Sequence, residues 1–167
     1  MKYYYSLEYT EGTSSRTRAA EECEKMLSQF MSGEVPEKIF NNFSKLVNRI
    51  SGGQPENWEI CFFPASSDAE TASRFSSLAS MLSESTGVHA SLNGMSRRSN
   101  GDGRLFDTPE FVCDSQSISG RNIILVDSLV TRGRTINAAA NALIDAGALS
   151  VTGLVAAKAM TGSQYAA

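Results

Sequence analysis

The segment "NIILVDSLVTRGRTINAAANALIDAGA", residues 122–148, most constrains what this chain can fold into. Its apolar run Ile123–Val126 is followed by a lone aspartate, Asp127, and then by the Thr-Arg-Gly-Arg-Thr sequence of residues 131–135. A short apolar run bounded by turn residues is typical of a buried strand in a parallel sheet. The Ala-rich stretch after it, closed by Gly147, is typical of a helix. We therefore predict a strand, a turn and a helix in direct succession.

Strands and helices are predicted to alternate from residue 58 onward. "WEICFFPA" indicates a buried strand, residues 66–87 a helix, "VHASLN" a strand and "SVTGLVAA" the last strand. Alternation of this kind predicts an α/β fold with a mostly parallel sheet flanked by helices. Residues 1–57, with one strand and two helices, are predicted to lie outside this unit as an N-terminal helical hood on a core of residues 58–167. With 167 residues, one compact domain is expected overall.

Composition excludes several classes of partner and location. The net charge of -3 and pI of about 5.2 do not favour a nucleic-acid partner. No apolar run approaches the ~20 residues that span a bilayer, and the N-terminus lacks the apolar core of a signal peptide. The three cysteines are widely spaced, which is typical of reduced thiols. We therefore expect a cytoplasmic protein without a membrane span.

The turn after Asp127 has the properties of an anion site. Ligands of open parallel sheets bind beyond the carboxyl ends of the strands, where Asp127 is predicted to lie. Backbone N–H groups at a helix start bind anions, and Gly133 lets the backbone approach one closely. The side chains of the turn add hydroxyl and guanidinium donors: Thr131, Arg132, Arg134 and Thr135. The arrangement suits a phosphate in the turn and a polyol or cation near Asp127.

The turn lacks the sequence patterns of several other phosphate sites. The chain has neither the G-x-G-x-x-G of a dinucleotide site nor the G-x-x-x-x-G-K-[ST] of a Walker A loop. A receiver-like role, with Asp127 phosphorylated, would need an acidic pair after the first strand of the unit, where "FFPASS" stands instead. A purely structural interpretation stays open at this point, in which Asp127 caps the turn and Gly133 only permits it.

The longer segment, residues 123–157, resembles the phosphoribosyl-diphosphate (PRPP) signature of type I phosphoribosyltransferases. That signature has an apolar strand, two acids, two apolar residues, Thr-Thr-Gly-x-Thr/Ser and an Ala-rich helix ending in Ala-Gly-Ala. The matching positions are Val126, Asp127, Leu129, Val130, Thr131, Gly133, Thr135 and Ala146–Ala148. Ser128 replaces the usual second acid, although uracil-type members also lack it, and Arg132 replaces the usual second Thr. The chain looks most like amidophosphoribosyltransferase-like domains of the ComF kind.

The resemblance implies roles for these residues. Residues 131–135 would hold the 5-phosphate of PRPP, with Arg132 and Arg134 adding positive charge. Asp127 would be the catalytic residue, a charged carboxylate that accepts hydrogen bonds from the ribose 2- and 3-hydroxyls. Ser128 would lie beside it, at the cost of one charged acceptor near the forming oxocarbenium.

Two further segments match the family's pyrophosphate loop and the flexible loop that closes over bound PRPP. The loop after "EICFF" offers Ala65, Ser66 and Ser67 at a helix start, and Arg74 is a further candidate for a pyrophosphate contact. An ordinary helix cap is the alternative for this loop. Residues 94–120 read as a long loop and match the family's flexible loop, with Arg97, Arg98 and Arg104 as its basic residues.

The implied reaction is displacement of pyrophosphate from PRPP by a nitrogen nucleophile. Mg2+ would be carried by PRPP itself, so that no metal-ligand residues are predicted in the chain. The acceptor would be chosen by the hood, and a homodimer is expected because dimers are common in the family. A second hypothesis is a non-catalytic regulator that senses PRPP or a nucleotide on the same fold, which Ser128 favours.

Overall fold

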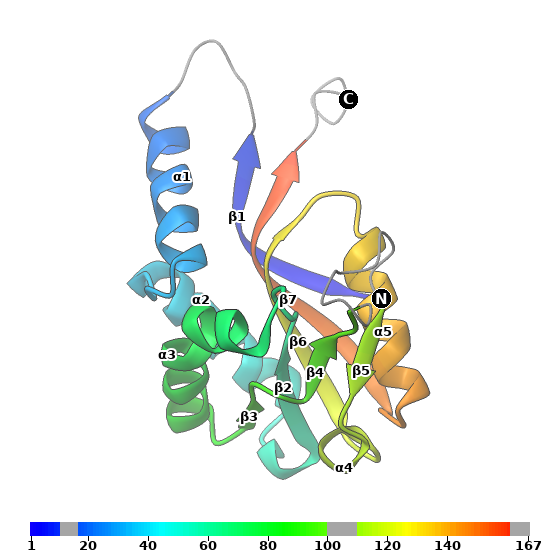
Figure 1. Cartoon of the computed structure of the whole chain (residues 1–167). Coiled ribbons are helices and arrows are strands. Elements are labelled where there is room, and N and C mark those ends of the chain that lie inside the picture. The colour runs from blue at the N-terminus through cyan, green and yellow to red at the C-terminus, as the bar shows by residue number, and fades with distance from the viewer. Residues whose placement is uncertain (11–16, 100–109, 161–167) are drawn as a thin grey trace.

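A parallel β-sheet forms the centre of the molecule (Figure 1). The computed structural model describes residues 1–10, 17–99 and 110–160. The sheet has five strands in the order β1-β7-β6-β2-β3, and every pair is parallel. The strands are β1 (Tyr3–Thr10), β2 (Trp58–Phe62), β3 (His89–Ser91), β6 (Asn122–Val130) and β7 (Ser150–Met160). The predicted α/β class with a parallel sheet is confirmed.

Helices cover both faces of this sheet. In Figure 1, α1, α2 and α3 lie on the left of the sheet and α5 lies on the right. The helices are α1 (Arg18–Met31), α2 (Glu37–Ser51), α3 (Asp68–Thr86), the short α4 (Ser115–Ile118), α5 (Arg134–Asp145) and the 3-10 turn η1 (Pro55–Asn57). In the parts of the chain that the structure describes, no helix has the length and apolarity to cross a membrane.

The N-terminal segment is part of the sheet, contrary to the prediction that residues 1–57 lie outside the alternating unit. Strand β1 pairs with β7 along Tyr3–Thr10 and forms one edge. Side chains from α1 and α2, such as Phe30 and Phe43, enter the same core as those of β6. Pairing of the first strand with the last is nonlocal, so the local pattern did not reveal it. A separate role of residues 1–57 as a hood over the acceptor stays a prediction.

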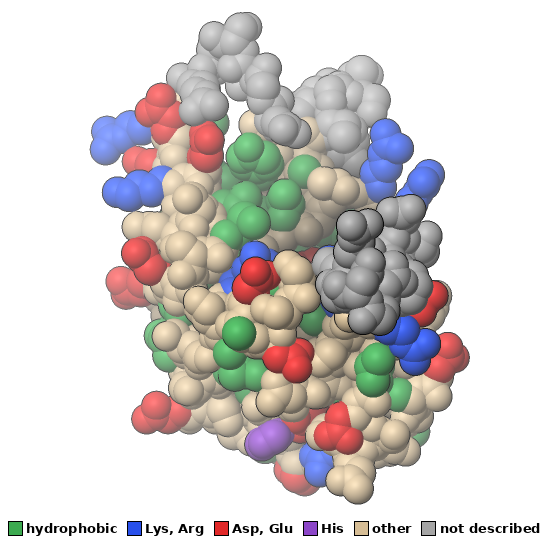
Figure 2. All heavy atoms as spheres, in the orientation of Figure 1, with side chains coloured by type: hydrophobic (Ala, Val, Ile, Leu, Met, Phe, Trp, Pro, Cys, Tyr) green, Lys and Arg blue, Asp and Glu red, His purple; other side chains and the backbone are tan. Residues whose placement is uncertain are grey.

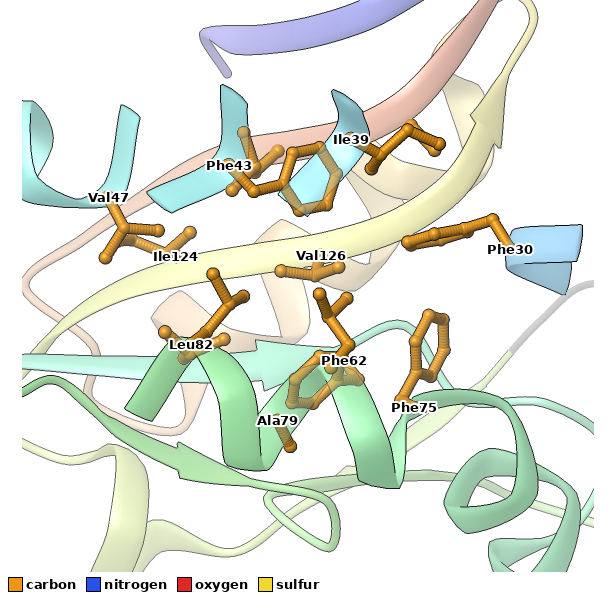
Figure 3. Packing of buried hydrophobic residues seen from close by; sticks show 14 of the residues in the cluster. Phe30, Ile39, Phe43, Val47, Phe62, Phe75, Ala79, Leu82, Ile124 and Val126 are labelled. Atoms are coloured by element: carbon orange, nitrogen blue, oxygen red, sulfur yellow. The ribbon is translucent and has the colours of Figure 1, made fainter. Parts of the chain in front are cut away.

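A run of phenylalanines fastens α1, α2 and α3 to the sheet (Figure 3). The rings of Phe30 and Phe43 meet edge to face at 5.9 Å, and those of Phe30 and Phe75 at 6.1 Å. Phe75 stacks on Phe62 of β2 at 5.0 Å. Removing one such buried ring costs about 3–5 kcal/mol. This cluster fixes α3 and β2, and therefore the loop between them, relative to β6.

In the neighbouring strands β1, β7 and β6, the alternation of side chains between the two faces of the sheet is interrupted at adjacent positions. In an even strand, residues two apart share a face. At these positions, residues three apart also pack on the same core: Tyr4 and Leu7, Leu154 and Ala157, Val126 and Leu129. Small residues, Ser6, Ala156 and Ser128, lie between the members of the pairs, and Ala156 belongs to the same core. The strands curve strongly (Figure 1). Ser128, on β6, is buried.

The segment 94–120, expected to be a long loop, contains regular structure. Strands β4 (Met95–Arg97) and β5 (Phe111–Cys113) form an antiparallel hairpin, and α4 follows it. The hairpin is tied to the neighbourhood of the β2–α3 loop, because Phe111 packs edge-on against Phe63 at 5.5 Å. The expectation of an irregular segment was therefore wrong at both ends. Its middle, which includes Arg104, lies outside the described residues.

Candidate functional site

The turn between β6 and α5 is built around Gly133. Strand β6 ends at Val130 and α5 begins at Arg134. Gly133 is the N-cap residue of α5 and has φ 79, in the left-handed region that residues with a Cβ rarely adopt. No side chain caps this helix. The N-cap residue of α5 therefore offers no side-chain oxygen to the first N–H groups of the helix.

The backbone donors of this turn are unused. The first hydrogen bond of α5 runs from the Asn137 N–H to the Gly133 carbonyl at 3.0 Å. In residues 1–10, 17–99 and 110–160, no group accepts a hydrogen bond from the N–H groups of residues 131–135. The side chains at the turn are exposed and likewise have no hydrogen-bond or ion-pair partner there: Thr131, Arg132, Arg134 and Thr135. Donors and cations gather at a helix start, an arrangement that attracts an anion.

Asp127 lies four residues before Thr131, the first residue of this turn, and is partly buried. Its Oδ1 accepts a hydrogen bond from the backbone N–H of Ser128 at 2.7 Å. Burial raises the pKa of Asp127 to about 7, against the opposing effects of that hydrogen bond and of the Arg74 guanidinium. The carboxyl is therefore divided between its two charge states near neutral pH. Further hydrogen-bond donors, such as a diol, would favour the charged form.

Ser128, expected to stand beside Asp127 at the ligand, lies inside the protein. Only 2% of its surface is exposed, and its Oγ is buried without a hydrogen-bond partner among the described residues. A buried hydroxyl without a partner costs about 1–3 kcal/mol. Direct contact of the Ser128 side chain with a ligand would require this part of β6 to move. That contact stays a prediction.

The predicted pyrophosphate loop caps α3. Ser67 is the N-cap residue and accepts from the Glu70 N–H at 3.2 Å. Ser66 Oγ donates to Glu70 Oε2 at 2.7 Å, and the Ala65 N–H donates to Thr71 Oγ1 at 2.9 Å. The side chains of both serines therefore serve the cap, as the alternative interpretation expected. The N–H groups of Ser66 and Ser67 donate to no described group and are the donors left for a ligand.

Sequence reasoning missed the part that Glu70 takes in this loop. Ser67 and Glu70 stand three residues apart at a helix start, which is the spacing of a capping box. That signal was present in "SDAE". Glu70 places a negative charge at the loop that was expected to hold pyrophosphate.

The same loop lies against the strand that carries Asp127. The Phe63 N–H donates to the Val126 carbonyl at 2.7 Å, one residue before Asp127. Arg74 of α3 acts electrostatically on Asp127 and has no hydrogen bond or ion pair with any described residue. It also lines a cavity of about 210 Å³ between the end of α1 and α3, together with Met31, Ser32, Glu70 and Ser73. Arg74 is thus near enough to Asp127 for its charge to oppose the rise in the pKa of that carboxyl.

The hairpin contributes a second arginine. Arg97 of β4 has its Nε buried without an acceptor among the described residues. Arg98 instead makes a surface ion pair with Glu110, with Nη1 and Oε2 3.7 Å apart. Ser96 between Met95 and Arg97 donates from Oγ to Asp68 Oδ1, at the start of α3, at 2.8 Å. Of the two predicted loop arginines that the structure describes, Arg97 is thus the one with a buried donor that lacks an acceptor among the described residues.

The surface around these elements is hollowed. Figure 2 shows a hollow in the upper half of one face, with hydrophobic side chains on its wall and basic and acidic side chains together at its lower end. Figures 1 and 2 share an orientation, so this hollow lies on the side where β1 and β7 end. Among the described residues, no group of three or more His, Cys, Asp or Glu side chains could hold a metal ion.

In comparisons with known proteins, this chain is similar to solved structures only. No protein-family model and no curated protein matches the chain. The hypoxanthine phosphoribosyltransferase of Trypanosoma cruzi, in complex with IMP, is 14% identical with a TM-score of 0.48, over 75% of this chain and 74% of that one. The hypoxanthine-guanine phosphoribosyltransferase of Leishmania donovani is 17% identical with a TM-score of 0.46, over 71% and 67%.

A third likeness is to a larger enzyme. The phosphoribosylpyrophosphate synthetase of Mycobacterium smegmatis is 18% identical with a TM-score of 0.44, over 70% of this chain. The match spans only 32% of the synthetase. At identities and scores this low, these likenesses establish neither a family nor an activity, and the argument for function comes from the residues of the site.

Proposed function

We propose that this chain is a phosphoribosyltransferase-like protein that binds PRPP and transfers its phosphoribosyl group to a nitrogen nucleophile, releasing pyrophosphate. One observation carries the proposal. The N–H groups of residues 131–135 have no acceptor among the described residues, at a helix start shortly after Asp127 and in register with the PRPP signature. An anion in this turn would accept hydrogen bonds that no described group of the protein accepts.

Asp127 is assigned to the ribose. Its Oδ1 already accepts from the Ser128 N–H, which leaves Oδ2 and the remaining lone pairs for the 2- and 3-hydroxyls. Hydrogen bonds from a diol stabilise the carboxylate, so PRPP binding would lower the pKa of Asp127 from about 7. A charged Asp127 would then lie near the ribose as positive charge develops on it during cleavage of the C1–O bond.

The leaving pyrophosphate is assigned to donors that have no partner among the described residues. These are the buried Nε of Arg97, the guanidinium of Arg74 and the backbone N–H groups of Ser66 and Ser67. Arginine suits this role because its fork of donors stays charged and matches phosphate oxygens. The protein would contribute mainly by positioning PRPP and neutralising the leaving group.

Magnesium would be held by PRPP. Asp127 is one carboxylate beside the turn rather than part of a metal-ligating cluster, and Mg2+ in such sites is bound mostly through substrate phosphates and water. When bound, the ion would neutralise charge on the departing pyrophosphate. The acceptor would be chosen by residues of the hood, and a homodimer remains part of the proposal.

Calorimetric titration with PRPP and Mg2+ tests the binding step, and pyrophosphate release across bases, ammonia and amines tests turnover. Wild-type protein should bind PRPP, and a variant with Asp127→Asn should bind it more weakly. Absence of PRPP binding to the wild-type protein would end the proposal.

A second candidate is a non-catalytic sensor of PRPP or a nucleotide. Ser128 favours it, because a serine stands where the signature has a second acid and its side chain is buried. Asp127 is then the one acid that β6 can present to the ribose. The two candidates differ in one result. PRPP binding without pyrophosphate release from any acceptor would select the sensor.

A further inference from the structure

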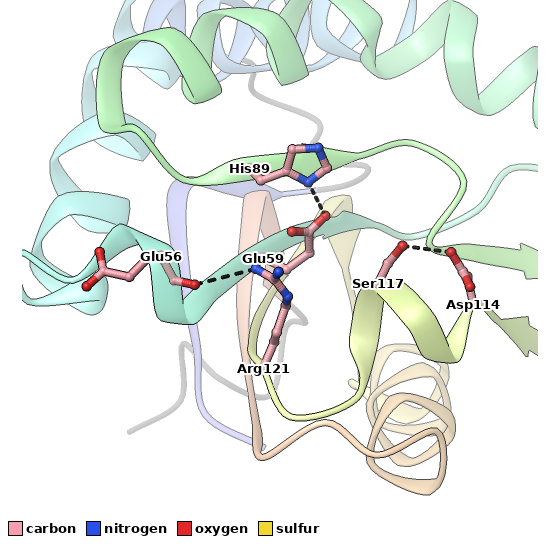
Figure 4. Close-up of polar contacts among 6 residues, drawn as sticks. All are labelled: Glu56, Glu59, His89, Asp114, Ser117 and Arg121. Carbon is pink, nitrogen blue, oxygen red and sulfur yellow. Dashed lines mark hydrogen bonds and ion pairs between the residues drawn. The ribbon is translucent and has the colours of Figure 1, made fainter.

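A small polar cavity lies at the edge of the sheet opposite to the 131–135 turn (Figure 4). Its volume is about 230 Å³, and it is lined by Glu59, His89, Asp114, Gln116, Ser117 and Arg121. Glu59 and His89 lie at the amino-terminal ends of β2 and β3, and Arg121 directly precedes β6. The proposed PRPP site uses none of these residues, so the cavity needs an explanation of its own.

Glu59 is the most deeply buried charge in this cavity. Only 1% of its surface is exposed, and its one hydrogen bond among the described residues is with His89 Nδ1, 2.6 Å from Oε1. A carboxylate has about four lone-pair sites, so most of its capacity is unused. Burial raises the pKa of Glu59, while His89 and Arg121 act in the opposite direction. Burying a carboxylate costs several kcal/mol unless donors satisfy it.

Arg121 lines the same cavity without touching Glu59. No described carboxylate lies within ion-pair distance of its guanidinium. Its one hydrogen bond there is long, from Nη1 to the Glu56 carbonyl at 3.4 Å (Figure 4). A buried acceptor and a strong donor group therefore share one small space and stay apart.

The remaining walls are fixed by α4. Asp114 Oδ1 accepts from the Gln116 N–H at 3.1 Å, and its Oδ2 accepts from Ser117 Oγ at 2.7 Å. Asp114 thus holds the start of α4 in place while adding negative charge beside Glu59. The side-chain amide of Gln116 has no partner among the described residues and can donate as well as accept.

We propose that this cavity binds a small zwitterion of the α-amino acid class, with its ammonium on Glu59 and its carboxylate on Arg121. A ligand that satisfies this cavity needs hydrogen-bond donors facing Glu59 and acceptors facing Arg121. Arginine binds carboxylates through paired, charge-assisted hydrogen bonds. A simple cation would meet repulsion from Arg121, and a simple anion would meet it from Glu59 and Asp114.

The size and opening of the cavity fit such a ligand. A volume of 230 Å³ equals that of about eight water molecules at ~30 Å³ each, enough for the backbone of an amino acid. The His89 side chain is 71% exposed, so the cavity opens to solvent beside it. The side chain of the bound amino acid would leave through this opening.

Calorimetry and saturation-transfer NMR with each of the twenty amino acids at millimolar concentration test the proposal on the full chain. At least one amino acid should bind, and its N-acetyl and carboxamide derivatives should each bind about tenfold more weakly or worse, because each lacks one charge. Arg121→Met should weaken binding by a similar factor. Arg49→Met, at an exposed arginine in the last turn of α2, is the matched control and should change nothing.

The proposal would be overturned if no amino acid binds. It would also be overturned if Arg121→Met binds the amino acid as tightly as wild type does, or if the N-acetyl and carboxamide derivatives both bind as tightly as the free amino acid. Glu59→Gln adds a second variant, checked for folding by circular dichroism, and should lose the preference for a free ammonium. Titration of Arg121→Met with PRPP keeps the two sites apart, since this variant should bind PRPP as the wild-type protein does.

Discussion

Helices α3 and α5 both begin just beyond the carboxyl edge of the sheet, yet their first turns differ. α3 is capped by its own chain, because Ser67 accepts from the Glu70 N–H and Ser66 donates to the Glu70 carboxylate. α5 has Gly133 as its N-cap residue, which has no side chain to cap it, and the N–H groups around it have no acceptor in the part of the chain that the structure describes. The difference indicates that α3 gains stability from its start, whereas α5 keeps its start open for a ligand.

The largest expected effect comes from restoring the acid that the PRPP signature would have at residue 128. Because Ser128 is 2% exposed, Ser128→Asp would bury a carboxylate and should lower the free energy of unfolding by roughly 2–4 kcal/mol. Urea unfolding measures it. Ser128→Ala is the control and should be neutral or stabilising, since it removes a hydroxyl without a partner. A stable Ser128→Asp protein that gains turnover would contradict the buried position of Ser128.

Asp127→Asn should weaken PRPP binding by about 1.5–3 kcal/mol, because it removes a charged acceptor beside the open turn. The same substitution should raise the free energy of unfolding at high pH, although it weakens PRPP binding. The folded pKa of about 7 lies above the unfolded value near 3.8, so the folded state holds the extra proton between them. Asp127 therefore costs stability as pH rises through that window, and Asn does not.

Unfolding of both proteins at pH 5 and pH 8 measures this difference. The advantage of Asp127→Asn over wild type should be larger at pH 8. Equal advantages at the two pH values would mean that the pKa of Asp127 is not raised by burial, and unchanged PRPP affinity would remove Asp127 from the ribose.

Gly133→Ala tests whether the backbone of the α5 start binds the phosphate. With φ 79, a Cβ at this residue should cost about 1–2 kcal/mol of stability and weaken PRPP binding, because the turn must shift. Gly52→Ala is a matched control, since Gly52 also has positive φ, at 58, with nothing within 4 Å of an added Cβ. It should lose stability and keep PRPP affinity. Equal PRPP affinity of the two variants would contradict binding of the phosphate by the backbone of this turn.

The smallest effect is expected at the capped helix. Ser67→Ala removes the N-cap of α3 and should cost about 1 kcal/mol of stability. PRPP affinity should stay within about twofold, because the proposed contacts there are backbone N–H groups. A large loss of affinity without loss of stability would show that the Ser67 side chain serves pyrophosphate, and the contrast between α3 and α5 would then disappear.

The sequence alone determined the strand, turn and helix around Asp127 and Gly133, and the parallel sheet. These features depend on residues close together in the chain: apolar periodicity, a glycine in the turn and an Ala-rich helix. For the same reason "SDAE" contained the α3 cap. What stays a prediction is the ligand, since the residues that would hold it are known by position and chemistry only.

The tertiary structure decided the rest. Pairing of β1 with β7, the burial of Ser128 and the electrostatic effect of Arg74 on Asp127 all depend on residues far apart in sequence. So does the cavity between Glu59 and Arg121. Local periodicity tells which residues prefer the interior but not which strand they meet or in which register, because those follow from packing of the whole chain.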